Sequence, residues 1–410
     1  MQLRPILSTL RRHKLTAWLL ILEIALTCAI VCNAVFLIGQ RLQRMDMPSG
    51  VAEHELLQIQ VADVVQPANP YARVQEDLAL LRQVPGVQSV AFTNQVPFGG
   101  SSSNGNVMLD PSQPQRTLNA TTYFGENLVP TMGIQLVSGR DLQPDDFVDV
   151  EAALKGLSNG DSKSLPHVAL ITSILAERLW PGQNPLGRII YLTPQVGLRV
   201  VGVLASLARP NAYDASKAQY TMVVPLHMGA DKGESYVIRT RPQDRVRVMS
   251  AALAALKKAD PQRVVTTQRT FDEVRRRFFQ DDRAMAGMLV GVIAALLIVT
   301  ALGIVGLASF WVAQRRRTIG VRRALGATRA NILHYFQTEN FVLATIGIAL
   351  GMVLAYGINL FLMTHYELPR LPAIYFPIGA VALWLIGQLA VLGPALRAAA
   401  VPPVVATRSV

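Results

Sequence analysis

Four apolar stretches, each long enough to cross a lipid bilayer as a helix, constrain this 410-residue chain more than any other feature. A hydrocarbon core of about 30 Å requires about 20 apolar residues of helix. The stretches lie at residues 16–39, 284–311, 336–363 and 373–396. Residues 40–283 contain no further stretch of this kind. The sequence therefore predicts an α-helical membrane protein with four transmembrane helices and a large domain between helices 1 and 2.

The basic residues set the predicted orientation, because short loops rich in Lys and Arg stay in the cytoplasm. They flank the apolar stretches, at Arg4, Arg11, Arg12 and Lys14, at Arg315, Arg316, Arg317, Arg322, Arg323 and Arg329, and at Arg397 and Arg408. The turn between the last two stretches holds only Arg370. We therefore expect a multi-pass protein of the bacterial inner membrane, with cytoplasmic termini and a periplasmic domain. The net charge of +12 then indicates contact with membrane lipid and not with nucleic acid.

The first stretch is predicted to be an uncleaved anchor, since it is longer than the 7–15 apolar residues of a signal peptide. Three of its residues are candidates for a functional role. Glu23 is either part of a substrate or proton path, or a carboxylate hydrogen-bonded to a neighbouring helix or hydrated near the headgroups. Cys28 and Cys32 have no His or carboxylate on their helical face, which favours small-residue packing over a metal site.

Two pairs of glycines have a spacing that lets helix backbones approach closely. They are Gly287 with Gly291 and Gly347 with Gly351. The pattern is common by chance in apolar helices. It indicates helix packing within a tight bundle or at a dimer seam.

The region between the first two stretches has the pattern of an α+β domain with an internal repeat. A strand, a helix and a strand are expected at 54–62, 71–84 and 87–93, and again at 236–240, 243–258 and 263–268. The first helix should bury Leu78, Leu81 and Val84. The second helix should bury Val246, Met249, Ala252, Leu253 and Leu256. Two such units at the ends of the region predict a split β-α-β lobe with a second lobe inserted in it.

The expected division of the chain follows from these elements. Residues 1–40 form the cytoplasmic N-terminus and first span, and 41–112 the first part of the β-α-β lobe. Residues 113–215 form the inserted lobe and 216–270 the second part of the β-α-β lobe. Residues 271–410 comprise a stalk at 271–283, the last three spans, a cytoplasmic loop at 312–335 and the tail.

No arrangement of residues typical of an enzyme is present in the sequence. The six His are scattered, and neither His-Glu-x-x-His nor Gly-x-Ser-x-Gly occurs. Between Gly156 and Ser164 the glycines and Lys163 lack the spacing of a phosphate loop. We therefore expect no catalytic residue, no metal site and no cofactor bound by this chain.

The loop after the second apolar stretch carries the most informative residues. A short helix in it would present an apolar edge with cationic flanks to a protein groove; alternatively, the arginines hold the loop against anionic lipid. The candidate residues are Arg317, Thr318, Ile319, Gly320, Arg322, Arg323, Ala324, Leu325, Gly326 and Ala327.

This loop resembles the signature of FtsX-type permeases, Arg-Glu-Ile-Gly-x-Arg-x-Ala-x-Gly-Ala, with Thr318 in place of the usual Glu. The C-terminal segment 394–408 is similar to the ending of that family, from which Val405 and Thr407 depart. The domain between helices 1 and 2 resembles the MacB-type periplasmic core domain at residues 123–124, 133–134, 139–141, 179–187 and 200–203.

The resemblance implies a permease subunit of a type VII ABC transporter without its own ATPase site. A separate cytoplasmic ATPase would bind ATP and Mg, dock on the loop and move the periplasmic domain through the stalk, a mechanism called mechanotransmission. A second permease protomer, of the same or a similar chain, is implied, as are a periplasmic adaptor and an outer-membrane channel. Export or efflux is the first expectation. Control of a cell-wall hydrolase, as by FtsX, and lipoprotein release, as by LolC/LolE, are the alternatives.

Overall fold

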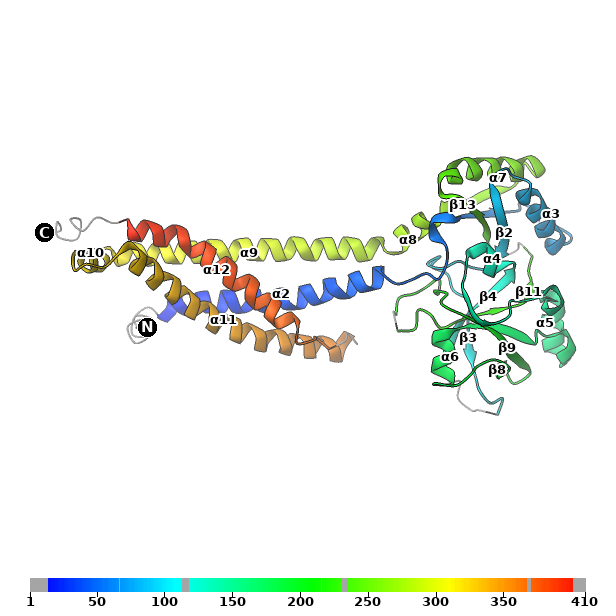
Figure 1. Ribbon diagram of the computed structural model, residues 1–410, viewed down its shortest axis with the longest axis horizontal. Helices are drawn as coiled ribbons and strands as arrows, with labels where there is room; N and C mark the ends of the chain where they lie inside the picture. The colour runs from blue at the N-terminus through cyan, green and yellow to red at the C-terminus, as the bar shows by residue number, and fades with distance from the viewer. Residues whose placement is uncertain are drawn as a thin grey trace. The chain divides into compact units, whose positions relative to one another are not determined.

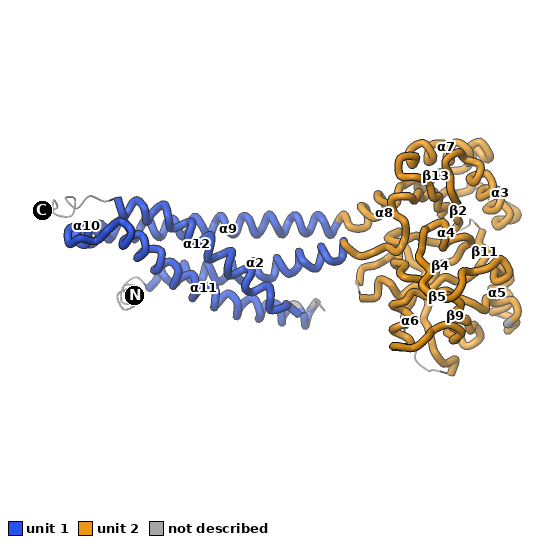
Figure 2. Tube along the Cα trace, viewed as in Figure 1, with its two compact units in different colours: residues 1–45, 281–410 blue, residues 46–280 orange. Residues whose placement is uncertain are grey.

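The computed structural model describes residues 14–65, 67–112, 118–214, 216–229, 235–366 and 370–400. Two compact units divide the chain, residues 1–45 with 281–410 and residues 46–280 (Figure 2). Hereafter they are called the helical unit and the α/β unit. Of the basic residues that flank the spans, Arg4, Arg11, Arg12 and Arg408 lie outside the described residues, as do Val405 and Thr407.

The helical unit contains four helices that are long and apolar enough to cross a membrane (Figure 1). They are α2 (Lys14–Met45), α9 (Gln280–Gln314), α11 (Arg329–Tyr366) and α12 (Tyr375–Ala399). The prediction of four apolar helices is thus confirmed. A fifth, short helix, α10 (Arg316–Ala324), joins α9 to α11.

The core of the helical unit is built around α2, which packs against α11 and α12. Ile24, Cys28 and Cys32 of α2 are almost fully buried in this core, together with Leu343 and Leu383. By contrast, only 11% of the most apolar window of α9 is buried, against 61% for α2. Most of the surface of α9 is therefore uncovered within one chain.

The α/β unit is built on one 11-stranded sheet with the strand order β13-β1-β12-β2-β4-β10-β7-β9-β5. β3 pairs with β4 and β8 with β9, while β11 and β6 form a separate ribbon. The strands are β1 (Leu56–Ala62), β2 (Val87–Thr93), β3 (Asn104–Val107), β4 (Leu118–Glu126), β5 (Leu136–Gly139), β6 (Val148–Asp149), β7 (Val168–Thr172), β8 (Ile189–Thr193), β9 (Val196–Leu204), β10 (Thr221–Val224), β11 (Leu226–His227), β12 (Ser235–Thr240) and β13 (Val264–Thr270).

Six α-helices and four short 3₁₀-helices accompany these strands among the described residues of the unit. The α-helices are α3 (Pro70–Arg82), α4 (Leu128–Met132), α5 (Val150–Asn159), α6 (Ser173–Leu179), α7 (Arg245–Ala259) and α8 (Phe271–Phe278). The 3₁₀-helices are η1 (Glu53–Glu55), η2 (Pro144–Asp146), η3 (Ser162–Ser164) and η4 (Pro242–Asp244).

The two ends of the α/β unit form a first lobe in which β1-α3-β2 and β12-α7-β13 interleave. Their strands are neighbours in the order β13-β1-β12-β2, with all three pairs antiparallel. The helices α3 and α7 contact each other and pack on one apolar cluster of this lobe (Figure 1). α3 begins where the Asn69 side chain accepts the Ala72 N–H at 3.0 Å, with Pro70 in the first turn.

One expected core residue of this lobe is wrong. Leu78, Leu81 and Val84 of the first repeat are buried as predicted. On α7, however, Val248, Ala252 and Leu256 are fully buried, while the side chain of Val246 is 80% exposed. The helix is rich in alanine and carries more than one apolar stripe. The sheet beneath it selects the stripe that faces inward, and periodicity alone does not.

The second lobe continues the same sheet through a short pairing of β2 with β4. Phe92 pairs with Glu126 and Thr93 with Gly125. Gly125 has φ +138°, and a Cβ there would lie 2.0 Å from the carbonyl oxygen of Phe92, so only glycine fits this crossing. The sheet of the second lobe includes β3 and β10, so it extends past the expected bounds of 113 and 215 at both ends.

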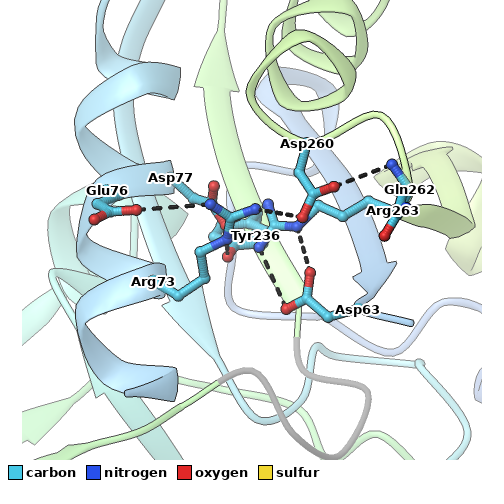
Figure 3. Close-up of polar contacts among 8 residues, drawn as sticks. All are labelled: Asp63, Arg73, Glu76, Asp77, Tyr236, Asp260, Gln262 and Arg263. Atoms are coloured by element: carbon cyan, nitrogen blue, oxygen red, sulfur yellow. Dashed lines mark hydrogen bonds and ion pairs between the residues drawn. The ribbon is translucent and has the colours of Figure 1, made fainter. Parts of the chain in front are cut away.

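A buried cluster of charged side chains lies in the first lobe, beside the start of β13 (Figure 3). Arg263, which precedes β13, donates to Asp63 at 2.5 Å and to Asp77 of α3 at 2.7 Å. The hydroxyl of Tyr236 donates to the same Asp77 at 2.5 Å. The Arg263 side chain is 1% exposed, so the cluster ties the ends of two strands to a helix inside the lobe.

Candidate functional site

The short helix α10 follows α9 and ends in a glycine that its geometry requires. The N–H of Ala327 donates to the carbonyl of Arg322 at 3.0 Å, and the N–H of Gly326 donates to Arg323 at 3.2 Å. This pair of bonds is the Schellman motif, which needs a left-handed residue just past the helix. Gly326 supplies it with φ +98°. The Gly-Ala sequence therefore fixes where α10 stops.

α10 is anchored to the ends of the long helices by one apolar and two polar contacts. Ile319 is 6% exposed and lies in a cluster that includes Phe336 of α11 and Ala398 of α12. Arg323 donates to the carbonyl of Ala399 at 2.6 Å. Just before α10, Arg315 forms an ion pair at 2.8 Å with a carboxylate of α11. A displacement of α10 is therefore a displacement of α9, α11 and α12.

The opposite face of α10 is open. Val321 is 47% exposed and Leu325 is 83% exposed, and Arg317 is exposed four residues before Val321. Residues four apart share a helix face, so two apolar side chains and a cation are presented together. The exposed candidates are Arg317, Thr318, Arg322, Ala324, Leu325 and Gly326, and Arg323 and Ala327 are half-buried. Ile319 and Gly320, which were expected in the docking edge, are buried and hold the helix in place.

The carboxylate that pairs with Arg315 belongs to Glu339, a residue that the sequence interpretation missed. Its side chain is 2% exposed, and it lies within the apolar stretch 336–363. A single acid inside an apolar stretch is a usable signal, because such a group needs a partner. Thr318, which replaces the family Glu, is exposed. The carboxylate that pairs with Arg315, next to the start of α10, thus comes from α11.

Glu23 of α2 faces α9. A Cβ placed on Gly303 would lie 2.5 Å from Oε2 of Glu23, so the glycine leaves room for the carboxylate. One turn further along, the hydroxyls of Thr27 and Thr300 are 2.9 Å apart. These polar groups lie along the contact between α2 and α9.

The two glycine pairs have different environments. A Cβ on Gly347 would lie 2.8 Å from Ile24, and a Cβ on Gly351 would lie 2.5 Å from Cys28, so α11 packs closely on α2 here. Cβ atoms on Gly287 and Gly291 of α9 would meet nothing within 4 Å. Cys28 and Cys32 are free and buried, and the described residues contain no group that could hold a metal ion.

The connecting helix α8 belongs to the α/β unit and contacts both of its lobes. The sequence grouped it with the membrane helices as part of a stalk at 271–283. Asp272, in its first turn, binds Arg245 of α7 and lies 2.9 Å from His54. Burial would raise the pKa of Asp272, but the hydrogen bonds and charges of Arg245 and His54 together outweigh it, and the pKa is lowered. At its other end, Phe278 packs against Phe98 with a centroid distance of 5.3 Å.

α8 also ties together the two ends of the α/β unit. Arg275 donates to the carbonyl of Met47 at 2.7 Å and to Glu53 at 2.6 Å. Within the helical unit, Arg41 of α2 pairs with Asp282 of α9 at 2.6 Å. Each unit thus carries its own bridge between the two chain segments that connect the units.

The sequence matches two family models. The model of the FtsX-like permease C-terminal domain matches residues 290–403, and that of the MacB-like periplasmic core domain matches residues 19–256. The chain belongs to the MacB/FtsX family of ABC transporter permeases. Its four apolar helices and its α/β unit are the parts of a multi-pass membrane protein of that family.

Known relatives cover the chain to different extents. The uncharacterized ABC transporter permease YknZ of Bacillus subtilis is 24% identical over 99% of this chain and 98% of its own length. The pyoverdine export ATP-binding/permease protein PvdT of Pseudomonas putida is 30% identical over 61% of this chain. The macrolide export ATP-binding/permease protein MacB of Chromobacterium violaceum is 24% identical over 61% of this chain. The chain spans 39% of the length of each of the latter two.

Two solved structures are similar to the chain. The periplasmic region of MacB from Actinobacillus actinomycetemcomitans has 14% identity and a TM-score of 0.35, and covers 56% of this chain and 94% of its own. The extracellular domain of YknZ from Gram-positive bacteria has 16% identity and a TM-score of 0.32, and covers 51% of this chain and 100% of its own.

Proposed function

We propose that this permease couples ATP hydrolysis by a separate cytoplasmic ABC ATPase to movement of its α/β unit, in the export of a periplasmic or membrane-derived substrate. ATP and Mg would bind to the ATPase and not to this chain. The export direction is supported by the names of MacB and PvdT, which are export proteins. In this proposal the protein lies in the bacterial inner membrane, with both termini and α10 in the cytoplasm and the α/β unit in the periplasm.

One observation carries the proposal: α10 is fixed on one face and open on the other. Ile319 and Arg323 hold it against α11 and α12, while Leu325 is 83% exposed. An exposed leucine flanked by cations suits a groove with an apolar floor and an acidic rim. An ATPase that pushed on this face would move three long helices together.

The bridges at the connections support transmission to the α/β unit. α2 and α9 lead into that unit, and the Arg41–Asp282 pair couples their ends. In the α/β unit, Arg275 joins the entering segment at Met47 to the leaving helix α8. Force arriving through either connection would thus be shared by both.

A second permease protomer, of the same or a similar chain, would cover α9 in this proposal. The exposed surface of α9 and the open positions at Gly287 and Gly291 support this. A periplasmic adaptor and an outer-membrane channel would complete the export path.

The docking step is tested with the full chain and its ATPase subunit, coexpressed and purified together. Leu325→Asp should abolish copurification, because it places a carboxylate in the apolar groove. Leu154→Asp is the matched control, since Leu154 of α5 is 60% exposed in the other unit. The proposal fails if Leu325→Asp leaves the complex intact, or if Leu154→Asp disrupts it equally.

A further inference from the structure

A cavity of about 380 Å³ lies in the α/β unit beside the end of β4. Its walls include Glu126, Leu128, Asp141, Leu142, Phe147 and His227. This volume lies in the range of pockets that bind small organic molecules. Neither the coupling helix nor the connecting segments described above contribute to it.

One carboxylate of the cavity is held by three donors on a single oxygen. Oε1 of Glu126 accepts from the hydroxyl of Tyr71 at 3.0 Å and from the amide of Gln75 at 3.1 Å. Nδ1 of His227 lies 2.5 Å from the same oxygen. Among the described residues, none donates to Oε2 of Glu126. The network fixes the orientation of the carboxylate and leaves one oxygen for another partner.

The second carboxylate has still fewer partners. Oδ1 of Asp141 accepts the backbone N–H of Leu142 at 2.7 Å, and no described side chain donates to the carboxylate. Burial raises the pKa of Asp141, and that backbone bond and the Arg140 charge only partly oppose the shift. Arg140 itself is engaged by Asp146, with bonds of 2.6 and 2.9 Å. Asp141 is therefore a partly buried carboxylate without a cation bonded to it.

The remaining walls are apolar and aromatic. The ring of Phe147 stacks on the ring of His227, with centroids 5.2 Å apart and planes at 23°. Leu128 and Leu142 add aliphatic surface. The residues that line the cavity include no Lys or Arg, which disfavours an anionic ligand. The described residues also include no group that could hold a metal ion.

We propose that this cavity binds an organic cation, whose ammonium group pairs with Asp141 and Glu126 and whose apolar body lies against Phe147, Leu128 and Leu142. The two carboxylates indicate that the ligand is positively charged, and the volume of the cavity indicates its size. The claim that such a cation is the cargo of the permease rests on the proposed function. Binding of the cation to the cavity can be tested without the ATPase.

The site also lies where the two lobes meet. Tyr71 and Gln75 belong to α3 of the first lobe, whereas Phe147 and His227 belong to the second. A ligand that pulls on Glu126 would act on a carboxylate that both lobes hold. Its binding would therefore change the contact between the lobes.

The test uses the full chain in nanodiscs of zwitterionic lipid, with para-fluorophenethylamine as the probe and fluorine NMR as the readout. Wild-type protein should bind this amine at least about tenfold more tightly than para-fluorophenylethanol or para-fluorophenylpropionate, which keep the ring and change the charge. Asp141→Asn keeps the acceptor for Leu142 and should weaken amine binding about tenfold. Asp145→Asn is the matched control, because Asp145 is an exposed acid four residues away.

Equal affinity for the amine and the alcohol would overturn the proposal, and so would equal effects of Asp141→Asn and Asp145→Asn. The comparison of probes needs only wild-type protein, so it decides the question even if a variant does not fold. Loss of ATPase docking, by contrast, would refute the coupling function and leave this result unchanged.

Discussion

The buried cluster around Arg263 allows the cost of removing one buried charge to be predicted as a change in stability (Figure 3). We consider Arg263→Met, which keeps most of the side-chain volume and removes the charge. The carboxylates of Asp63 and Asp77, 8% and 2% exposed, would then remain in the lobe without the guanidinium. The pKa of Arg263 shows that its contacts with these acids favour the charged form. Burial would lower the pKa of Arg263, yet the bonds to both acids outweigh it and raise the pKa.

Removing one partner of a buried ion pair costs about 3–5 kcal/mol, because the other charge is left uncompensated. Tyr236 still donates to Asp77 after the substitution and offsets part of that cost. We therefore expect the free energy of unfolding of the α/β unit to fall by about 3–4 kcal/mol. With a urea dependence of about 2–3 kcal/mol per M, the unfolding midpoint should fall by about 1–2 M.

Pulse proteolysis of the full chain in detergent, across a urea series, measures the fraction of intact α/β unit. Arg269→Met is the matched control, because Arg269 lies on β13, the strand that directly follows Arg263, is half-buried and has no ion pair among the described residues. Adding Asp77→Leu to Arg263→Met removes one of the stranded charges and should recover part of the loss.

The reasoning is refuted if Arg263→Met lowers the midpoint no more than Arg269→Met does. It is also refuted if adding Asp77→Leu destabilises the unit further by the full cost of a second buried substitution. In either case the cluster would contribute packing and not charge compensation.

Two further predictions concern the helical unit. Gly351→Leu should destabilise the packing of α11 on α2 by about 1–3 kcal/mol, since its Cβ would lie 2.5 Å from Cys28, and a lower melting temperature of the monomer would show it. Gly287→Leu should leave that temperature unchanged and shift the proposed dimer to monomer in light scattering; no shift would exclude Gly287 from the proposed dimer interface. In intact cells, an impermeant maleimide should label Ser158→Cys readily and Thr318→Cys only after permeabilisation, and the reverse pattern would invert the proposed topology.

The sequence predicted the four apolar helices well because the membrane imposes a length and a composition that each segment shows by itself. α9, for example, contains the whole of the expected stretch 284–311. The end of α10 is also set locally, by the Gly326-Ala327 pair that follows Leu325. The prediction that Val246 of α7 is buried was wrong, because the helix has more than one apolar stripe and the sheet beneath it determines which stripe faces inward.

The contacts that connect the ends of the α/β unit were beyond reach of any local pattern. Arg275 binds Met47 and Glu53, which precede it by more than 220 residues. An arginine in a charged helix has no feature that distinguishes a solvated side chain from one that bridges two chain segments. Glu339 differs in this respect, because an acid in an apolar stretch indicates that the charge needs a partner. The sequence does not identify that partner, and the structure shows that it is Arg315.

The cavity beside β4 is the extreme case of this limit, because no local pattern in the sequence predicts it. Its polar frame draws Tyr71 and Gln75 from one helix, Glu126 from a strand and His227 from a short ribbon, and these residues are separated by up to 156 positions. None of them forms a motif with its sequence neighbours. Their convergence depends on Gly125, which lets β4 cross to β2 and brings the end of one lobe against the helix of the other. A larger residue at that crossing should therefore disrupt the carboxylate network and the amine site together, although Gly125 contributes no side chain to either.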